Sequence, residues 1–194
     1  MVNVLKFMGI LLLVAPIARA SDNKIFLFGG VASRKAEISS CYRDPRYTNF
    51  GYPAEDQVAK VVAEINNHPD KAYTIAGHSS GAQYANMVAQ QVENPERITL
   101  VDLDGFAPRN VPAAVKRVCW KAVNGKGLSS RNAGSMTAGN NCQIVKTHLA
   151  PACRTKWCLH FSLVNPNAPE DLNSATWRTH GYRDCTPNLE WLEP

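Results

Sequence analysis

Short apolar runs alternate along the chain with segments in which apolar residues recur at helical spacing. The helical segments cover 54–66 and 82–92. Five runs have the length and composition of buried strands: 24–28, 72–76, 97–102, 115–123 and 159–164. Strands separated by helices predict an α/β fold with a mostly parallel open sheet and helices on both faces. Such sheets carry their functional residues just after the strands, at the carboxyl edge.

The N-terminus has the pattern of an export signal. Lys6 precedes an apolar stretch over 8–15, and Ala18-Arg19-Ala20 matches a small-residue cleavage site. The apolar stretch is too short to span a bilayer, and no later run is long enough. We therefore expect residues 1–20 to be a signal peptide cleaved after Ala20, and residues 21–194 to form a single domain. The protein is predicted to be secreted or periplasmic, without a transmembrane segment.

Six cysteines lie after the predicted cleavage site: Cys41, Cys119, Cys142, Cys153, Cys158 and Cys185. In an exported chain this number predicts two or three disulfides, because the compartment is oxidising. The sequence leaves the pairing open, but Cys153 and Cys158 are close enough to close a small loop. The chain lacks paired His and Cys at metal-ligand spacing, so we expect no metal and no cofactor.

Positive charge is concentrated in one part of the chain. Residues 105–169 contain nine Lys and Arg residues and no Asp or Glu. Such a segment can attract an anionic surface, such as acidic lipid, although an ordinary solvated basic face explains it more simply. No aromatic-interleaved nucleic-acid motif accompanies these charges, so we expect no nucleic-acid partner. Within it, the Gly- and Asn-rich stretch 124–141 predicts a long irregular loop, the only plausible lid over a site.

The strongest chemical signal is Gly77-His78-Ser79-Ser80-Gly81, which lies between a predicted strand and a predicted helix. This pattern is typical of a nucleophile elbow, in which a serine stands on a tight strand-to-helix turn. The residues two positions away must be small to avoid collision, and both are glycine here. The backbone N–H groups of the following helix point toward a developing oxyanion. The motif therefore predicts Ser79 as a nucleophile.

The elbow followed by Ala82 resembles the G-H-S-x-G-A motif of lipases in the α/β-hydrolase superfamily. The order of elements over most of the chain after residue 20 is similar as well. The resemblance to a small secreted lipase or esterase implies a Ser–acid–His triad in that chain order. It also implies an oxyanion hole, with one N–H from Ser80 and another from the loop after the first strand, at Gly30 or Val31.

The acid is predicted among the aspartates that follow the third strand. No acidic residue occurs after the next strand until Glu170. The stretch 103–108 is similar to the L-D-P-A-x-P of pancreatic-type lipases, with Gly105 in place of the first proline. This resemblance favours Asp104 as the acid, with Asp102 as the alternative.

A serine hydroxyl needs a base that titrates near neutral pH, so the base should be a histidine. His180 follows the last predicted strand, where the family places its histidine, and it is our first candidate with His148 second. His78 lies inside the elbow, and His68 precedes the elbow strand. His160 falls inside the predicted strand 159–164, where a histidine is usually part of the core.

Together these residues predict a serine hydrolase that cleaves carboxylic esters through an acyl-enzyme, as lipases and esterases do. Only about ten residues separate Asp104 from the next strand, which leaves no room for a large cap. We expect an open site for accessible esters or lipid surfaces, in a monomer. Thioester or amide hydrolysis, or acyl transfer to another acceptor, would use the same triad. A catalytically silent module that binds an anionic partner is the alternative from another class.

Overall fold

The structure is a computed structural model that describes residues 23–31, 33, 45–106, 108–134, 142–165, 167–177 and 192. Four of the sequence-based predictions concern other residues. The signal peptide, Cys41, Cys185 and His180 lie outside the described residues.

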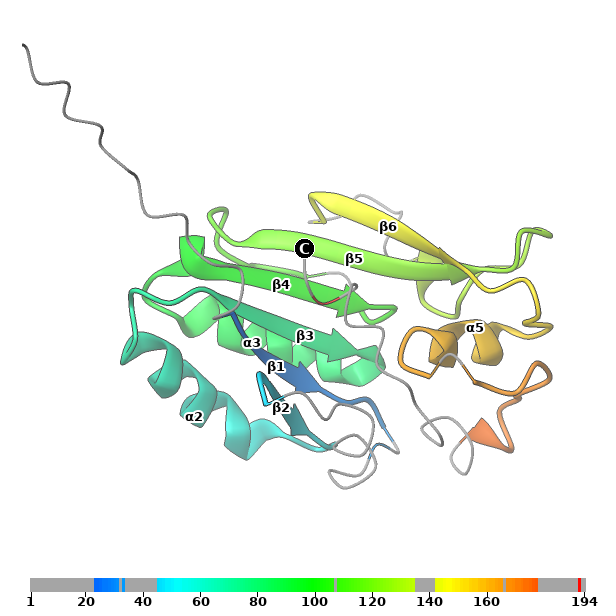
Figure 1. Cartoon of the computed structure of the whole chain (residues 1–194), viewed down its shortest axis with the longest axis horizontal. Helices are drawn as coiled ribbons and strands as arrows, with labels where there is room; N and C mark the ends of the chain where they lie inside the picture. The colour runs from blue at the N-terminus through cyan, green and yellow to red at the C-terminus, as the bar shows by residue number, and fades with distance from the viewer. Residues whose placement is uncertain are drawn as a thin grey trace, which may run out of the picture.

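A six-stranded parallel sheet forms the centre of the molecule (Figure 1). Its spatial order is β2-β1-β3-β4-β5-β6, and every neighbouring pair is parallel. The carboxyl ends of the strands therefore share one edge. The strands are β1 (Lys24–Phe28), β2 (Tyr47–Phe50), β3 (Tyr73–His78), β4 (Ile98–Leu103), β5 (Lys116–Val123) and β6 (Ile144–Leu149).

Helices cover both faces of the sheet, as predicted. On one face α2 (Glu55–Asn66) and α3 (Ala82–Gln91) pack against alternate strand residues such as Phe26, Ile75 and Leu100. On the other face α5 (Lys156–Ser162) packs against the intervening residues, among them Ile25 and Val101. This alternation follows from the two-residue period of a strand, and it buries both sides of β1, β3 and β4.

Three strand predictions were incomplete or wrong. The edge strands β2 and β6 were not predicted, because neither has a continuous apolar run and β6 alternates between exposed and half-buried positions. The run 159–164 was predicted as a strand, but 159–162 belong to α5. Periodicity cannot separate a short buried helix from a buried strand. The local signal for a helix was Thr155, whose hydroxyl caps its N-terminus by accepting from the Cys158 N–H at 3.0 Å.

Two disulfides join described residues. Cys153 bonds Cys158 across the start of α5, as the spacing suggested, and Cys119 in β5 bonds Cys142 just before β6. Both bonds therefore lie in the part of the chain that builds the β5 side of the sheet. The disulfide-containing α/β prediction is confirmed. In the described part of the chain, no helix has the length and apolar character needed to cross a membrane.

Candidate active site

Ser79 lies at a sharp strand-to-helix turn. β3 ends at His78, a single 3₁₀ turn covers Ser79–Gly81, and α3 follows at once. The φ angle of Ser79 is 54°, a left-handed conformation that non-glycine residues seldom adopt. Strained residues of this kind persist where the surrounding structure holds them, often at functional sites. The backbone therefore has the form of the predicted nucleophile elbow.

Close backbone contacts explain the two glycines of the motif. A Cβ at Gly77 would lie 2.4 Å from the Cα of Ala82, and one at Gly81 would lie 2.2 Å from the Phe28 carbonyl oxygen. Any side chain at either position would force the turn away from β1 and from the start of α3. The small residues thus allow the turn to be tight.

Gly105, the departure from the lipase-like pattern, is also required by packing. A Cβ there would lie 2.3 Å from the Ala82 Cβ and 2.6 Å from the Ser79 carbonyl oxygen. The turn after β4, which carries Asp104, is therefore in close contact with the turn that carries Ser79.

Asp104 follows β4 and is completely buried. Its φ is 50°, a conformation that Asp tolerates better than most residues, and its N–H donates to the Trp120 carbonyl at 2.9 Å. The Ser130 hydroxyl donates to Oδ1 at 2.7 Å, and the Asn132 N–H donates to Oδ2 at 3.3 Å. The Asn132 side-chain amide also donates to the Asp104 carbonyl oxygen at 2.6 Å. These contacts hold the carboxylate in one orientation.

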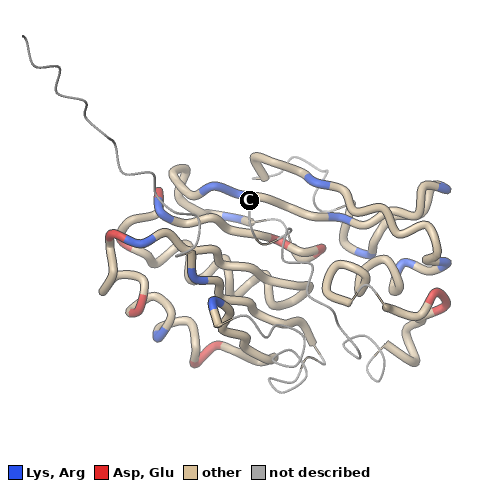
Figure 2. The backbone as a smooth tube through the Cα atoms, viewed as in Figure 1, with Lys and Arg blue, Asp and Glu red and all other residues tan. Residues whose placement is uncertain are grey.

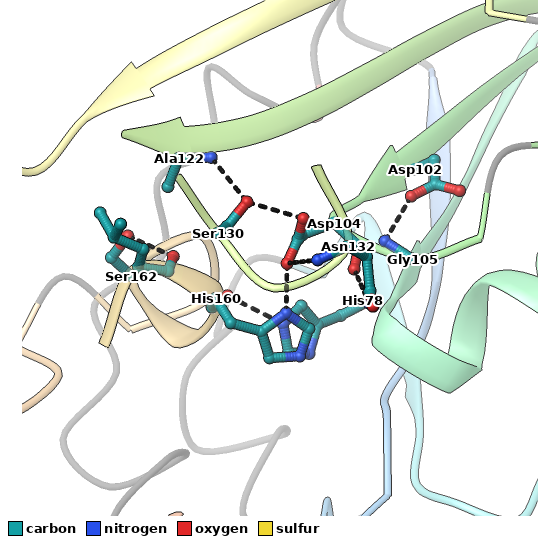
Figure 3. Close-up of polar contacts among 10 residues, drawn as sticks. His78, Asp102, Asp104, Gly105, Ala122, Ser130, Asn132, His160 and Ser162 are labelled. Atoms are coloured by element: carbon teal, nitrogen blue, oxygen red, sulfur yellow. Dashed lines mark hydrogen bonds and ion pairs between the residues drawn. The ribbon is translucent and has the colours of Figure 1, made fainter. Parts of the chain in front are cut away.

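His160 is the histidine that the structure places against Asp104. Its Nδ1 lies 2.5 Å from Asp104 Oδ2, and its ring is almost completely buried (Figure 3). His160 lies on α5, so its expected place within a strand was wrong. A core histidine was the default interpretation, and the ring is buried with an acidic partner 56 residues away in sequence.

The other histidine candidates do not occupy this position. His148, the second candidate, lies in the edge strand β6 opposite Ala122. His68 lies in the loop after α2, where its Nδ1 is 2.9 Å from the Glu64 carbonyl oxygen. His180, the first candidate, lies outside the described residues.

His78, the residue before Ser79, contacts His160 through its backbone and its ring. Its Nε2 lies 3.1 Å from the His160 carbonyl oxygen, and the two ring centroids are 4.5 Å apart. Burial, followed by repulsion from His160, lowers the pKa of His78 well below its ordinary value. His78 is therefore neutral at physiological pH. Since a carbonyl only accepts, the hydrogen must lie on Nε2.

Asp102, the alternative acid, lies apart from this cluster (Figure 3). Its Oδ1 accepts from the Gly105 N–H at 2.6 Å, whereas its buried Oδ2 has no hydrogen-bond partner among the described residues. Burial raises the pKa of Asp102 well above its usual range, although the Gly105 N–H opposes the shift. The structure thus gives Asp102 a part in the turn and gives Asp104 the histidine.

We predict that Asp102→Asn stabilises the protein at alkaline pH. The folded-state pKa of Asp102 is raised. Its stabilising contribution is therefore complete below the unfolded carboxyl pKa of about 4 and is lost as pH rises through the folded pKa. Asparagine resembles the neutral acid and does not titrate, so the variant should gain roughly 1–3 kcal/mol near pH 8 and little near pH 4. Thermal unfolding across pH measures this.

Asp171→Asn is the matched control for this prediction, because Asp171 is exposed. It should shift the melting temperature little at any pH. A gain from Asp102→Asn that is equal at acidic and alkaline pH would contradict the prediction.

Ser79 and His160 line the same pocket at the carboxyl edge of the sheet. The pocket has a volume of about 210 Å³, and among the described residues its polar lining includes Ser79, Ser80, Asn132 and His160 together with the cation Arg131. A serine on a strained turn, a buried Asp–His pair and a partly apolar cavity therefore meet at one place, as reactive sites commonly do.

The residues expected to form an oxyanion hole meet beside this pocket. Val31 and Ser80 both line it. The Val31 N–H donates to the Ser80 hydroxyl oxygen at 2.9 Å, which ties the loop after β1 to the residue that follows Ser79. The Gly30 carbonyl accepts from both the backbone N–H and the hydroxyl of Ser33. The loop thus has a defined shape against the elbow.

The loop that follows β5 supplies residues that sequence reasoning missed. It was predicted to be irregular and a possible lid. Its described part, residues 124–134, folds back with an antiparallel bridge between Val123 and Ser129 and brings Ser130 and Asn132 onto Asp104. Residues 135–141 lie outside the described residues, so the lid stays a prediction. Ser and Asn occur in many loops, so their type carried no signal. Only the fold shows that they donate to Asp104.

No protein-family model matches the chain, and no curated protein matches its sequence. Among solved structures, the chain is similar to an extracellular α/β-hydrolase from a Paenibacillus species, described as sharing structural and functional homology with tobacco salicylic acid binding protein 2. The two proteins have 26% sequence identity and a TM-score of 0.32. The match covers 45% of this chain and 42% of the other, so it spans less than half the length of that protein.

The fold is α/β-hydrolase-like. The features that give it this character are a parallel sheet, a serine on a strained turn between β3 and α3, and a buried Asp–His pair at the carboxyl edge.

Proposed function

We propose that this protein is a serine hydrolase that cleaves carboxylic esters, with Ser79 as nucleophile, His160 as base and Asp104 as the acid that orients it. The observation that carries this proposal is the buried Asp104–His160 pair, whose histidine lines one pocket with a serine held at positive φ. Buried pairs of this kind next to a strained serine are the arrangement that acyl transfer requires.

The reaction would proceed in two steps. Ser79 Oγ attacks the ester carbonyl while Nε2 of His160, the ring nitrogen that does not face Asp104, takes the hydroxyl proton. His160 then gives this proton to the departing alcohol, which leaves an acyl group on Ser79. In the second step water attacks the acyl carbonyl while His160 takes its proton. His160 then returns the proton to Ser79 Oγ, and the carboxylic acid is released. Asp104 keeps the hydrogen of the neutral ring on Nδ1 and stabilises the imidazolium that forms.

The oxyanion would be held by backbone donors beside Ser79. The Ser80 N–H and the N–H of Val31 or Gly30 are the proposed donors, because the loop after β1 and the start of the 3₁₀ turn meet there. The Val31 N–H is engaged by the Ser80 hydroxyl, so this hydroxyl would have to rotate away when an oxyanion forms.

The size of the pocket supports a small acyl group. An engineered apolar cavity of about 150 Å³ holds one benzene molecule, and the pocket here measures about 210 Å³. A group slightly larger than a benzene ring therefore fits. Two disulfides in the described part of the chain support action in an oxidising compartment, after export.

A serine-reactive fluorophosphonate tests this proposal directly. The probe should label the native protein at Ser79, as located by peptide mass spectrometry, and Ser79→Ala should abolish labelling. Ser174→Ala is the matched control, since Ser174 is an exposed serine that does not line the pocket. A native protein that stays unlabelled would instead indicate a binding module that kept the fold without the chemistry.

A further inference from the structure

Among the described residues, the pocket beside Ser79 has an apolar wall and a charged side chain that has no catalytic assignment. Val31, Phe106, Trp157, Phe161 and Trp177 form the apolar wall. Phe106 is 57% exposed and Val31 is 41% exposed, so apolar surface continues from the pocket to its mouth. The charged side chain is Arg131, which immediately precedes Asn132 in the loop that holds Asp104.

A stack of aromatic rings fixes the place of Arg131. Its guanidinium carbon lies 4.4 Å from the centroid of the Trp157 ring. Trp157 in turn stacks on Trp177, with ring planes 4° apart and centroids separated by 5.3 Å. A guanidinium over an indole face is attracted by the ring while its N–H groups stay available at the edge of the plane. The cation is thus held at the pocket and keeps its donors.

No carboxylate of the described residues forms an ion pair with Arg131. Asp104 is the nearest acid in sequence, but it is buried and already accepts from Ser130 and Asn132 beside His160. Residues 105–169 include no Asp or Glu at all. Figure 2 shows Lys and Arg along β5 and β6 and in the loops beyond their carboxyl ends. Arg131 therefore gives this side of the pocket a positive charge that favours a negatively charged group.

We propose that Arg131 is a specificity residue that binds a carboxylate carried by the substrate, so that the preferred ester combines a compact apolar body with one negative charge. A guanidinium recognises a carboxylate through two parallel N–H donors, and the apolar wall accepts the rest of the molecule. This inference rests on the proposed ester hydrolysis, because Arg131 can select an ester substrate only if Ser79 cleaves esters.

The test compares two esters of the same size and leaving group. One is the para-nitrophenyl ester of 4-methylbenzoate, which is neutral, and the other is the mono-para-nitrophenyl ester of terephthalate, which carries a carboxylate in place of the methyl group. The wild-type protein should prefer the charged ester in kcat/KM by about tenfold or more. Arg131→Gln should remove this preference, mainly by raising the KM of the charged ester.

Two further variants sharpen the comparison. Arg131→Lys should keep part of the preference, since it keeps the charge but not the two parallel donors. Lys156→Gln removes an exposed cation on α5, one residue from Trp157, that does not line the pocket. It should leave the preference unchanged. A third ester, with a phosphonate at the same ring position, distinguishes recognition of a carboxylate from a general preference for anions.

The two proposals fail in different ways. If neither ester is hydrolysed and the fluorophosphonate does not label Ser79, the hydrolase proposal is wrong and this inference falls with it. If the wild-type protein hydrolyses the neutral ester and shows no preference that depends on Arg131, only the role of Arg131 is overturned. An equal loss of preference in Lys156→Gln would assign the effect to the general field of the basic segment.

Discussion

Alanine in place of His160 should lower kcat for a para-nitrophenyl ester by roughly 10⁴-fold or more, whereas alanine in place of His180 should change it by less than about tenfold. The physical reason is the contact between His160 Nδ1 and Asp104 Oδ2 at 2.5 Å, together with the pocket that His160 shares with Ser79. A serine without a neighbouring base is a weak nucleophile at neutral pH. Steady-state kinetics of the two variants measures the difference.

His148→Ala is the matched control, because His148 lies in β6 and does not line the pocket. Since His160 is buried, the variants also need a melting temperature and a circular dichroism spectrum, so that lost activity is not confused with lost folding. His160→Gln is a second variant, whose side chain fills more of the space left by the imidazole ring than alanine does. The prediction is wrong if His180→Ala is the inactive variant while His160→Ala retains most of its kcat.

Asp104→Asn should reduce kcat by roughly 10⁴-fold with a much smaller effect on KM. The carboxylate accepts a hydrogen from the Nδ1 side of the His160 ring, which leaves Nε2 as the base. An asparagine amide in that place can present a donor, which favours the opposite tautomer with the hydrogen on Nε2. Such a ring cannot take the proton of Ser79. Ester hydrolysis measured as separate kcat and KM values shows the effect.

Asp102→Asn provides the comparison for this second prediction. The two aspartates are two residues apart and both are buried, but Asp102 contacts the Gly105 N–H rather than a histidine. The kcat of Asp102→Asn should stay within about threefold of the wild-type value. Equal losses in the two variants would show that the turn as a whole, and not the orientation of His160, controls the rate.

The nucleophile turn could be predicted from sequence because its determinants are local. Gly77 and Gly81 are required by backbone contacts within the turn and with the adjoining β1, and the strand and helix that flank Ser79 carry their own periodic patterns. The strands β1, β3, β4 and β5 were predicted for a similar reason. β1, β3 and β4 each contain a long buried run, which is the pattern of a strand covered on both faces. In β5 the buried run is short and covers Val118 and Cys119.

The histidine could not be identified in this way. His160 meets Asp104 across 56 residues of sequence, and its helix has only seven residues with an apolar composition that suits a strand equally well. The order of elements pointed to a later histidine. What the sequence did contain was the Thr155 cap and the Cys153–Cys158 spacing, which together mark the beginning of α5.

Sequence alone determined the alternating α/β pattern and the tight turn at Ser79, because these depend on neighbours along the chain. The strand end predicted for the acid came from the resemblance to lipases. Tertiary structure decided that Asp104 rather than Asp102 meets a histidine, that this histidine is His160, and that Ser130, Arg131 and Asn132 border the same pocket. The physical reason is that a parallel sheet brings the ends of distant strands to one edge. Which loop side chains meet there depends on packing across the sheet and not on spacing in the chain.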